Sequence, residues 1–257
     1  MRRERVVAEP IGGAGSAVVA CLARFLAEEP AVRPDRLPAL RELELDIRPV
    51  RLELRRAALS QRPLLLRGEQ GTHLSSVAVA VHRLSRRRGP FEERAGCELT
   101  RGRLGELLLN EPGLPATLHV QDVHELDQQG WAALAARIGD GSPARRHGFR
   151  IVASTGVGTG GAVTGRVEAS TMAVLGRLSL RVPPVRERRD LPLLVARGLR
   201  DAARRALSIT PEAYAVIARH AFPGNLDELE SALRHAAVLV DGGEVRVEHL
   251  PGWLRAD

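Results

Sequence analysis

The chain has 257 residues, 44% of them hydrophobic and only 3% aromatic, which is enough for a substantial core of Leu, Val and Ala. All 38 basic residues are arginine, which excludes any mechanism that draws a lysine from this chain. The net charge of +7 suggests a nucleic-acid partner, because arginines neutralise phosphates. However, 31 acids are interspersed, and the runs 86–88 and 145–146 are short, with no aromatic residue between them for base stacking. We therefore regard an arginine-rich nucleic-acid binder as the weakest hypothesis for this chain, and we do not expect the chain to contact DNA.

The sequence also bears on the cellular compartment. The two cysteines, Cys21 and Cys97, cannot form a disulfide framework. No apolar run approaches the roughly 18 residues of a membrane-spanning helix. Glu9 and Pro10 interrupt what would otherwise resemble the apolar region of a signal sequence, and residues 17–27 have the spacing of an amphipathic helix. We therefore expect a cytoplasmic protein without membrane contact.

The first two thirds of the chain alternate between strand and helix patterns. Apolar residues alternate from Leu43 to Leu54, which predicts two short strands separated by Pro49. Beyond them, short apolar runs are separated by segments with helical spacing, which predicts a parallel sheet with right-handed crossovers. The predicted strands cover 63–67, 116–120 and 149–154, the predicted helices cover 74–84 and about 131–138, and a glycine-rich loop covers 156–165.

After Pro183-Pro184 the pattern predicts helices only. The first covers Leu191 to Leu207, and Thr210 caps a second helix that has Pro211 at its first position. A third begins at Pro223-Gly224-Asn225 and continues to about Val240, with Leu226, Leu229, Leu233 and Val238 facing inward and Asp241-Gly242-Gly243 ending it. The sequence thus predicts an unassigned N-terminal extension (1–55), an α/β domain (56–185) and a small helical lobe (186–257).

Several separated motifs occur in a recognisable order. Residues 68–75 read GEQGTHLS, 80–85 read AVHRLS, 89–91 read GPF, 182–190 read VPPVRERRD and 222–239 read FPGNLDELESALRHAAVL. This order resembles the AAA+ domain of sigma-54-dependent transcription activators of the nitrogen-regulator type, whose phosphate loop has the form GESGTGKE. The resemblance covers roughly residues 60–251. It implies a P-loop NTPase-like (AAA+) parallel sheet with flanking helices, followed by a helical lid.

The phosphate loop departs from that family where its chemistry would lie. The loop corresponds to Gly68, Glu69, Gln70, Gly71, Thr72, His73, Leu74 and Ser75. The family's lysine, which neutralises the phosphate oxygens, is Leu74, and the glycine before it is His73. In the simpler interpretation, Gly68 and Gly71 only turn the chain from strand to helix. Weak anion binding by backbone N–H groups of Gly71 to Ser75 is left open.

The other catalytic positions implied by the resemblance also differ. The metal-binding Asp and the catalytic Glu correspond to Gln121 and Asp122, and Asp122 has an alternative role in capping the next loop. The sensor asparagine corresponds to Gly156, and the lid arginine to Asp227, a reversal of charge. We therefore expect a pseudo-ATPase, with no catalytic residue, no metal and no cofactor beyond weak ATP or ADP binding.

Intersubunit positions are partly retained in the resemblance. The first arginine-finger position is Thr171, whereas Arg177 matches the second and would face a neighbouring subunit. An arginine finger alone contributes about 10³–10⁵ in rate. The family's GAFTGA loop is missing between Glu92 and Pro115, and no helix-turn-helix follows the lobe before Asp257.

These observations leave three hypotheses. The first is a catalytically degenerate AAA+ protein that acts as a non-catalytic regulatory or scaffold module in transcription regulation, with an AAA+ relative or a second copy as its protein partner. The second is an ATP-binding sigma-54-interaction-domain transcription regulator with residual nucleotide binding, and the third is the nucleic-acid binder. The lysine-free loop and Gln121 favour the first.

Overall fold

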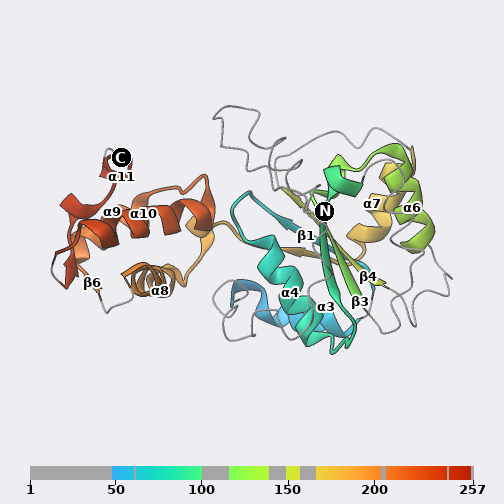
Figure 1. The fold of residues 1–257 in the computed structure, drawn as a ribbon, viewed down its shortest axis with the longest axis horizontal. Coiled ribbons are helices and arrows are strands. Elements are labelled where there is room, and N and C mark those ends of the chain that lie inside the picture. The colour runs from blue at the N-terminus through green and yellow to red at the C-terminus, as the bar shows by residue number, and fades with distance from the viewer. Residues whose placement is uncertain are drawn as a thin grey trace, which may run out of the picture.

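The computed structural model describes residues 48–60, 62–99, 116–138, 149–156, 166–203, 207–241 and 243–255. The helix expected over 17–27, the first strand expected after Leu43 and most of the glycine-rich loop lie outside these ranges. Two lobes lie side by side, one built on a sheet and one mostly helical (Figure 1). Among the described residues, no helix has the length and apolar character needed to span a membrane.

The first lobe, which we call the sheet lobe, is built on five parallel strands in the order β2-β3-β4-β1-β5. The strands predicted over 63–67, 116–120 and 149–154 are confirmed as β1, β3 and β4. Two further strands were not predicted: β2 reads FEERA, too polar for a buried strand, and β5 has only three residues. The bounds are β1 (Leu64–Gly68), β2 (Phe91–Ala95), β3 (Ala116–Gln121), β4 (Phe149–Gly156) and β5 (Ser179–Arg181).

Helices cover both faces of the sheet (Figure 1). Along β1, Leu64 and Leu66 join a core under α3 and α4, whereas Leu65 joins the opposite core under α6 and α7. This alternation explains why Leu64, Leu65 and Leu66 are apolar in succession, since both faces of this part of β1 are buried. The helices are α3 (Arg51–Leu59), α4 (Leu74–Leu84), α6 (Gln128–Ile138) and α7 (Arg166–Gly176), with short 3-10 turns η2 (Arg48–Val50), η3 (Gly96–Leu99) and η4 (Val123–Glu125).

The strand predicted to end at Leu54 is wrong, because α3 occupies this segment. Leu54, Ala57 and Ala58 are buried at helical spacing, whereas Leu52, the other half of the apparent alternation, is 61% exposed. Arg150 on β4 donates hydrogen bonds to the Ala57 and Ala58 carbonyls at the end of this helix. This tertiary contact outweighs a period-2 pattern only a few residues long. The domain boundary expected between residues 55 and 56 falls inside α3.

The second lobe, the lid lobe, has its own core around α8, α9 and α10. Thr210 caps α9 as predicted, since its Oγ1 accepts a hydrogen bond from the Ala213 N–H, and Pro211 follows it. The prediction of helices only is wrong, because β6 and β7 form a short parallel pair. The elements are η6 (Val185–Glu187), α8 (Leu191–Ala203), β6 (Ser208–Ile209), α9 (Pro211–Arg219), α10 (Asn225–Leu239), β7 (Glu244–Val245), η7 (Val247–His249) and α11 (Gly252–Arg255).

The inward face of α10 was predicted correctly except at its end. Leu226, Leu229 and Leu233 are at most 4% exposed, but Val238 is 82% exposed. Five residues beyond Leu233 is more than one full helical turn of 3.6 residues, so Val238 points away from the core. The apolar character of Val238 misled the prediction.

Candidate functional site

The loop between β1 and α4 lies at the carboxyl edge of the sheet and touches the start of α10. Gly71 has a φ of +77°, and a Cβ at this position would lie 2.1 Å from the Gly224 carbonyl oxygen. The same Cβ would be 3.2 Å from Oδ2 of Asp227, and the Leu226 N–H donates a 2.9 Å hydrogen bond to the Gly71 carbonyl. Only glycine permits this close approach of the loop and the lid lobe.

Gly68 serves a second turn at the end of β1. A Cβ there would lie 2.5 Å from the Thr72 hydroxyl oxygen, which donates a 2.7 Å hydrogen bond to the Glu69 carbonyl. Thr72 is itself 2% exposed. Both glycines therefore turn the chain from strand to helix, as the simpler interpretation expected.

The two residues that replace the family's Gly-Lys have contacts within the protein. His73 has a φ of 57°, a left-handed conformation that costs a non-glycine residue about 1 kcal/mol or more. Its Nε2 lies 3.1 Å from Oδ1 of Asp227. Leu74, the first residue of α4, packs against the apolar core under that helix.

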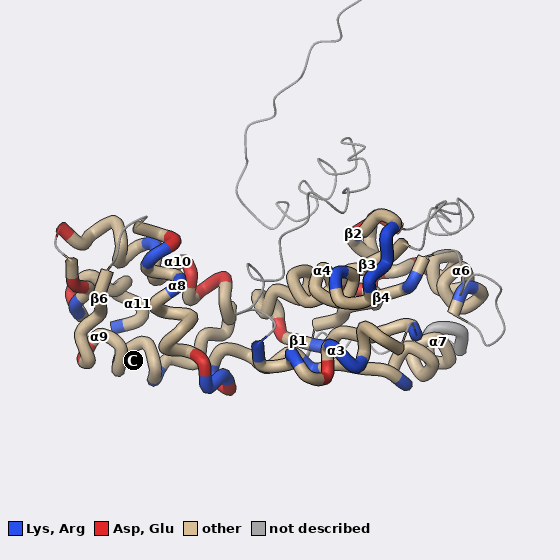
Figure 2. Tube along the Cα trace, turned by 90° about the horizontal axis from the view of Figure 1, so that it is seen from below, with Lys and Arg blue, Asp and Glu red and all other residues tan. Residues whose placement is uncertain are grey.

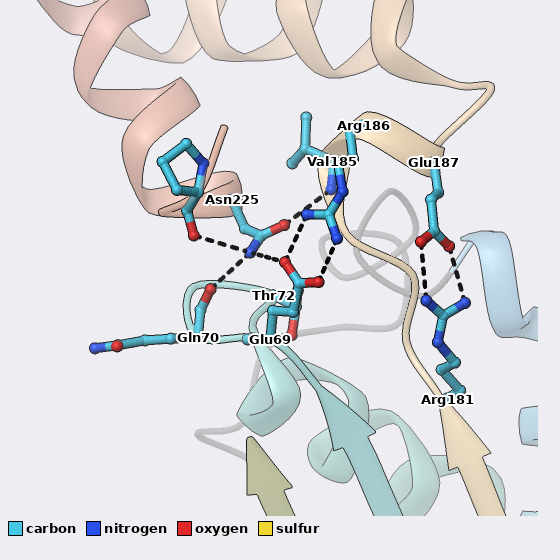
Figure 3. A network of polar contacts seen from close by, with 9 residues as sticks. Glu69, Gln70, Thr72, Arg181, Val185, Arg186, Glu187 and Asn225 are labelled. Atoms are coloured by element: carbon cyan, nitrogen blue, oxygen red, sulfur yellow. Dashed lines mark hydrogen bonds and ion pairs between the residues drawn. The ribbon is translucent and has the colours of Figure 1, made fainter. Parts of the chain in front are cut away.

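A group of polar contacts, which we call the lid junction, joins the loop to the lid lobe (Figure 3). The Arg186 guanidinium donates two hydrogen bonds to the Glu69 carboxylate, at 2.7 and 2.5 Å, and thereby holds the pKa of Glu69 below its ordinary value. The Asn225 Nδ2 donates to the Gln70 carbonyl at 2.9 Å, and its Oδ1 accepts from the Val185 N–H at 2.9 Å. Direct protein contacts thus hold the lid lobe on the loop.

A second group, the edge network, fills the carboxyl edge of the sheet beneath α4. The Gln121 Nε2 donates to the Ser75 hydroxyl and to Oε1 of Glu93, both at 2.7 Å. His119 is fully buried and lies 2.9 Å from Oε2 of Glu93 and 3.1 Å from the Ser154 hydroxyl. The network therefore joins three neighbouring strands to the first turn of α4.

The remaining predicted positions are less closely connected. Asp122 is exposed with a φ of 44°, and its carbonyl oxygen, not its side chain, accepts from the Glu125 N–H at 2.8 Å. Asp122 therefore stands at the N-cap of η4, as the capping interpretation expected, but it caps the turn through its carbonyl oxygen and not through its side chain. Gly156 ends β4. On α7, Thr171 is 2% exposed and cannot face a neighbouring subunit, whereas Arg177, just after the helix, is exposed.

Comparison with known proteins decides the family. Residues 186–257 match the AAA+ ATPase lid domain. The chain is 29% identical, over 77% of its length, to the DNA-binding transcriptional regulator NtrC of Escherichia coli, of which it covers 49%. It is 30% identical, over 90% of its length, to the Nif-specific regulatory protein of Sinorhizobium fredii, of which it covers 44%. The chain carries an AAA+ domain of the sigma-54 activator type.

Solved structures agree on the AAA+ fold. NtrX from Brucella abortus in complex with ATP superimposes with a TM-score of 0.65 at 23% identity, over 93% of this chain and 60% of that one. The RuvB Holliday junction branch migration motor of Thermotoga maritima has a TM-score of 0.55 at 18% identity, over 80% and 66% of the two chains. The chain spans about half or less of the length of the curated relatives cited above.

The AAA+ fold brings most of the predicted site together. The loop, Gln121 and Asp227 gather at the carboxyl edge, whereas Thr171 lies on α7 and Arg177 directly follows that helix. Neither Leu74 nor Gln121 offers a charge to a phosphate or a divalent metal, so the side chains present do not fit a Mg²⁺-nucleotide in the manner of the family. Among the described residues, no group of three His, Cys, Asp or Glu could hold a metal ion.

Sequence reasoning missed the residues that now occupy this edge of the AAA+ domain. Glu93, His119 and Ser154 become neighbours only through strand register, in which Glu93 pairs with His119. Arg186 and Asn225 lie inside the motifs that match the family, but nothing in their spacing indicated a contact with the loop. The signal that could have found Glu93 is its place two residues after the apolar Phe91, within the charged run 92–94.

Proposed function

We propose that this AAA+ domain is a non-catalytic regulatory or scaffold module that has lost ATP hydrolysis. One observation carries the proposal. The carboxylate of Asp227 lies over the phosphate loop, 3.1 Å from His73 and 3.2 Å from the Cβ position of Gly71. This carboxylate would repel a triphosphate that entered the loop, because both groups are negatively charged. Asp227 thus places a negative charge close to where the phosphates of a nucleotide would lie.

The edge network supports the same proposal at the metal position. Gln121 commits both hydrogens of its amide to Ser75 and Glu93. An Asp in its place would direct a carboxylate at Glu93 without a proton to share, which is unfavourable without a cation. The hydrogen bonds of Gln121 are therefore satisfied within the edge network without Mg²⁺. Leu74 packs against the core and supplies no charge.

The relatives support the biological setting, since those cited above are named as a DNA-binding transcriptional regulator and a Nif-specific regulatory protein. We propose that this chain acts in transcription regulation in the cytoplasm, with a protein partner that is an AAA+ relative or a second copy of itself. Its lid lobe is held on the loop by protein contacts, so partner binding should not depend on nucleotide. Sedimentation with the partner should give the same affinity in ATP and in EDTA.

The catalytic part is tested by steady-state phosphate release with Mg²⁺-ATP. We expect no turnover above background, and any nucleotide binding measured by calorimetry should be weak and independent of Mg²⁺. The matched variant combines four substitutions that restore the residues of the family: His73→Gly, Leu74→Lys, Gln121→Asp and Asp227→Arg. This variant should gain Mg²⁺-dependent nucleotide affinity. Such a gain would show that these four substitutions cause the loss of nucleotide binding.

The second candidate function is an ATP-binding transcription regulator with residual nucleotide binding. It is favoured by the fold shared with NtrX, which was crystallised with ATP. Micromolar, Mg²⁺-dependent ATP affinity in the unmodified chain, or turnover that Asp122→Ala abolishes, would overturn our proposal in favour of this one.

A further inference from the structure

The positive charge of the chain is concentrated in one segment. Residues 48–91 contain ten arginines and two acids, Glu53 and Glu69, whereas the other 28 arginines are matched by 29 acids. Glu69 is already paired with Arg186 at the lid junction. The net charge of +7 therefore originates from this segment and is not spread over the molecule.

Folding brings several arginines of this segment to the amino edge of the sheet, opposite the phosphate loop. Arg150, at the start of β4, donates hydrogen bonds to the Ala57 and Ala58 carbonyls at the end of α3 and to the Arg62 carbonyl before β1. Arg87 donates a 2.7 Å hydrogen bond to the carbonyl of Ala116, the first residue of β3. Residues 55–60, Arg62 and residues 86–88 are therefore held around the same sheet edge.

Within this arrangement the covered and exposed arginines differ in role. Arg150 is buried and Arg87 half-buried, and both fix the geometry through carbonyl contacts. Burial, with a further contribution from Arg87, lowers the pKa of Arg150 to about 10, so positive charge is crowded here. Five exposed arginines at this edge form what we call the basic face: Arg55, Arg56, Arg62, Arg86 and Arg88. Figure 2 views the molecule from below, with basic positions along α3 and in the region of β2 and β3.

We propose that the basic face binds the phosphate backbone of duplex DNA without reading its sequence. The guanidinium forks of arginine match phosphate oxygens in bidentate geometry. No aromatic residue is exposed in the described parts of the segment, since Phe91 is 2% exposed, so the base stacking that holds single strands is missing. Only two large apolar side chains, Leu52 and Leu59, are exposed in those same parts, too few to insert into a lipid surface.

The sequence argued against DNA contact because each arginine run looked short. Arg86, Arg87 and Arg88 alone would make a weak site, and the arginines of α3 are about thirty residues away in the chain. The carbonyl contacts of Arg87 and Arg150 join the two groups, and this could not be seen before the strand order was known. The basic face is remote from the phosphate loop, so this proposal stands whether or not nucleotide binds.

The test is fluorescence anisotropy of the full chain with a labelled random-sequence duplex of 20 base pairs. With about five phosphate contacts, affinity should fall by roughly 10²–10³ between 50 and 200 mM salt. The test variant changes Arg55, Arg56, Arg86 and Arg88 to Gln. The control variant changes four exposed lid-lobe arginines to Gln, for the same change in net charge: Arg189, Arg200, Arg219 and Arg234.

We expect the test variant to bind at least tenfold more weakly with a shallower salt dependence, and the control variant to bind within about threefold of the parent. Thermal melting of both variants checks that they fold. An equal loss in the two variants would reduce the effect to net charge and overturn the proposal. Absence of duplex binding at 50 mM salt would also overturn it, as would tighter binding to a single strand, to polyglutamate or to anionic vesicles.

Discussion

Asp227 and Leu229 lie two residues apart on α10 but have different surroundings. The Asp227 side chain is 67% exposed and contacts His73, whereas Leu229 is 1% exposed in the core of the lid lobe. Exposed pairs contribute about 0–1 kcal/mol, so Asp227→Arg should change the free energy of unfolding by only about 0.5 kcal/mol. Leu229→Ala should cost about 2–5 kcal/mol. Urea unfolding of both variants measures the contrast, and loss of folding in Asp227→Arg would make Asp227 a structural residue.

His82 should make the protein sensitive to mild acid. It is 1% exposed, lies 2.9 Å from the Thr117 hydroxyl, and burial together with Arg83 and Arg87 lowers its pKa from 6.5 to about 4. Between these values the unfolded chain binds a proton that the folded protein does not. The free energy of unfolding should therefore fall as pH decreases from about 6.5 towards 4, by up to about 3 kcal/mol.

The control is His82→Asn, which keeps a polar atom near Thr117 but cannot titrate. Its free energy of unfolding should be lower at every pH because of lost packing, but the decline between pH 6.5 and 4 should be smaller than in the parent. Denaturant unfolding at several pH values gives both slopes. Parallel curves for the two proteins would show that other groups cause the acid sensitivity.

At the residue scale, the sequence revealed what had been lost but not what replaced it. The sequence alone identified Leu74, Gln121 and Asp227 as replacements of the family's residues, because the surrounding motifs fixed the alignment. The replacement contacts could not, since His73 reaches Asp227 across 154 positions and Glu93 lies on a strand that was not predicted. Side-chain partners of this kind depend on the lobe arrangement and the strand register.

The packing of α8 against α10 depends on a glycine. A Cβ on Gly198 would lie 2.4 Å from Cδ1 of Leu233, which is 1% exposed and cannot turn away freely. Alanine is the better helix former by about 1 kcal/mol, yet we expect Gly198→Ala to destabilise the lid lobe by about 1–3 kcal/mol through overpacking. Thermal unfolding is the measurement.

Gly176, the last residue of α7, provides the matched control. A Cβ there would meet only the end of the Arg67 side chain, at 3.9 Å, an ordinary contact. Gly176→Ala should therefore leave the melting temperature unchanged or raise it. If Gly198→Ala raised it as well, the two helices of the lid lobe would be able to separate without cost.

At the element scale, helices and strands were predicted correctly where they are long enough to show a clear apolar pattern. β1, β3 and β4 are apolar runs and were found, as were α4, α6, α9 and α10. The three-residue β5 is too short to show a period, and α3 shows alternation by coincidence over a few positions. β5 is stabilised by pairing with β1, and α3 by the contacts of Arg150, neither of which a local pattern can contain.

At the scale of the whole molecule, Asn225 connects the two lobes. It is fully buried and bonds the Gln70 carbonyl on the loop and the Val185 N–H before α8, with Glu69 Oε2 also within 3.3 Å. Asn225→Asp preserves its size but turns the donor into a carboxylate that faces two acceptors. We expect thermal unfolding to separate into two transitions, with faster hydrogen exchange in residues 69–72.

A second substitution tests the electrostatic cause. Glu69→Gln removes the carboxylate that would repel the one introduced by Asn225→Asp, so the double variant should recover part of the lost coupling. A single, unchanged transition in the Asn225→Asp variant would show that the backbone contacts of Gly71 suffice to hold the lobes together.

The buried cores divide the chain at Pro183-Pro184. Every described member of the two sheet-lobe cores lies at or before Val182, and every described member of the lid-lobe core lies at or after Val185. During translation, domains generally fold as units with the N-terminal one first, so the sheet can close while the lid is still in the ribosome. The lid junction then forms when the two folded lobes dock, on a timescale of milliseconds or longer. A released chain that stops before Val185 would already carry every described member of the two sheet-lobe cores and would present an uncovered loop to the cell.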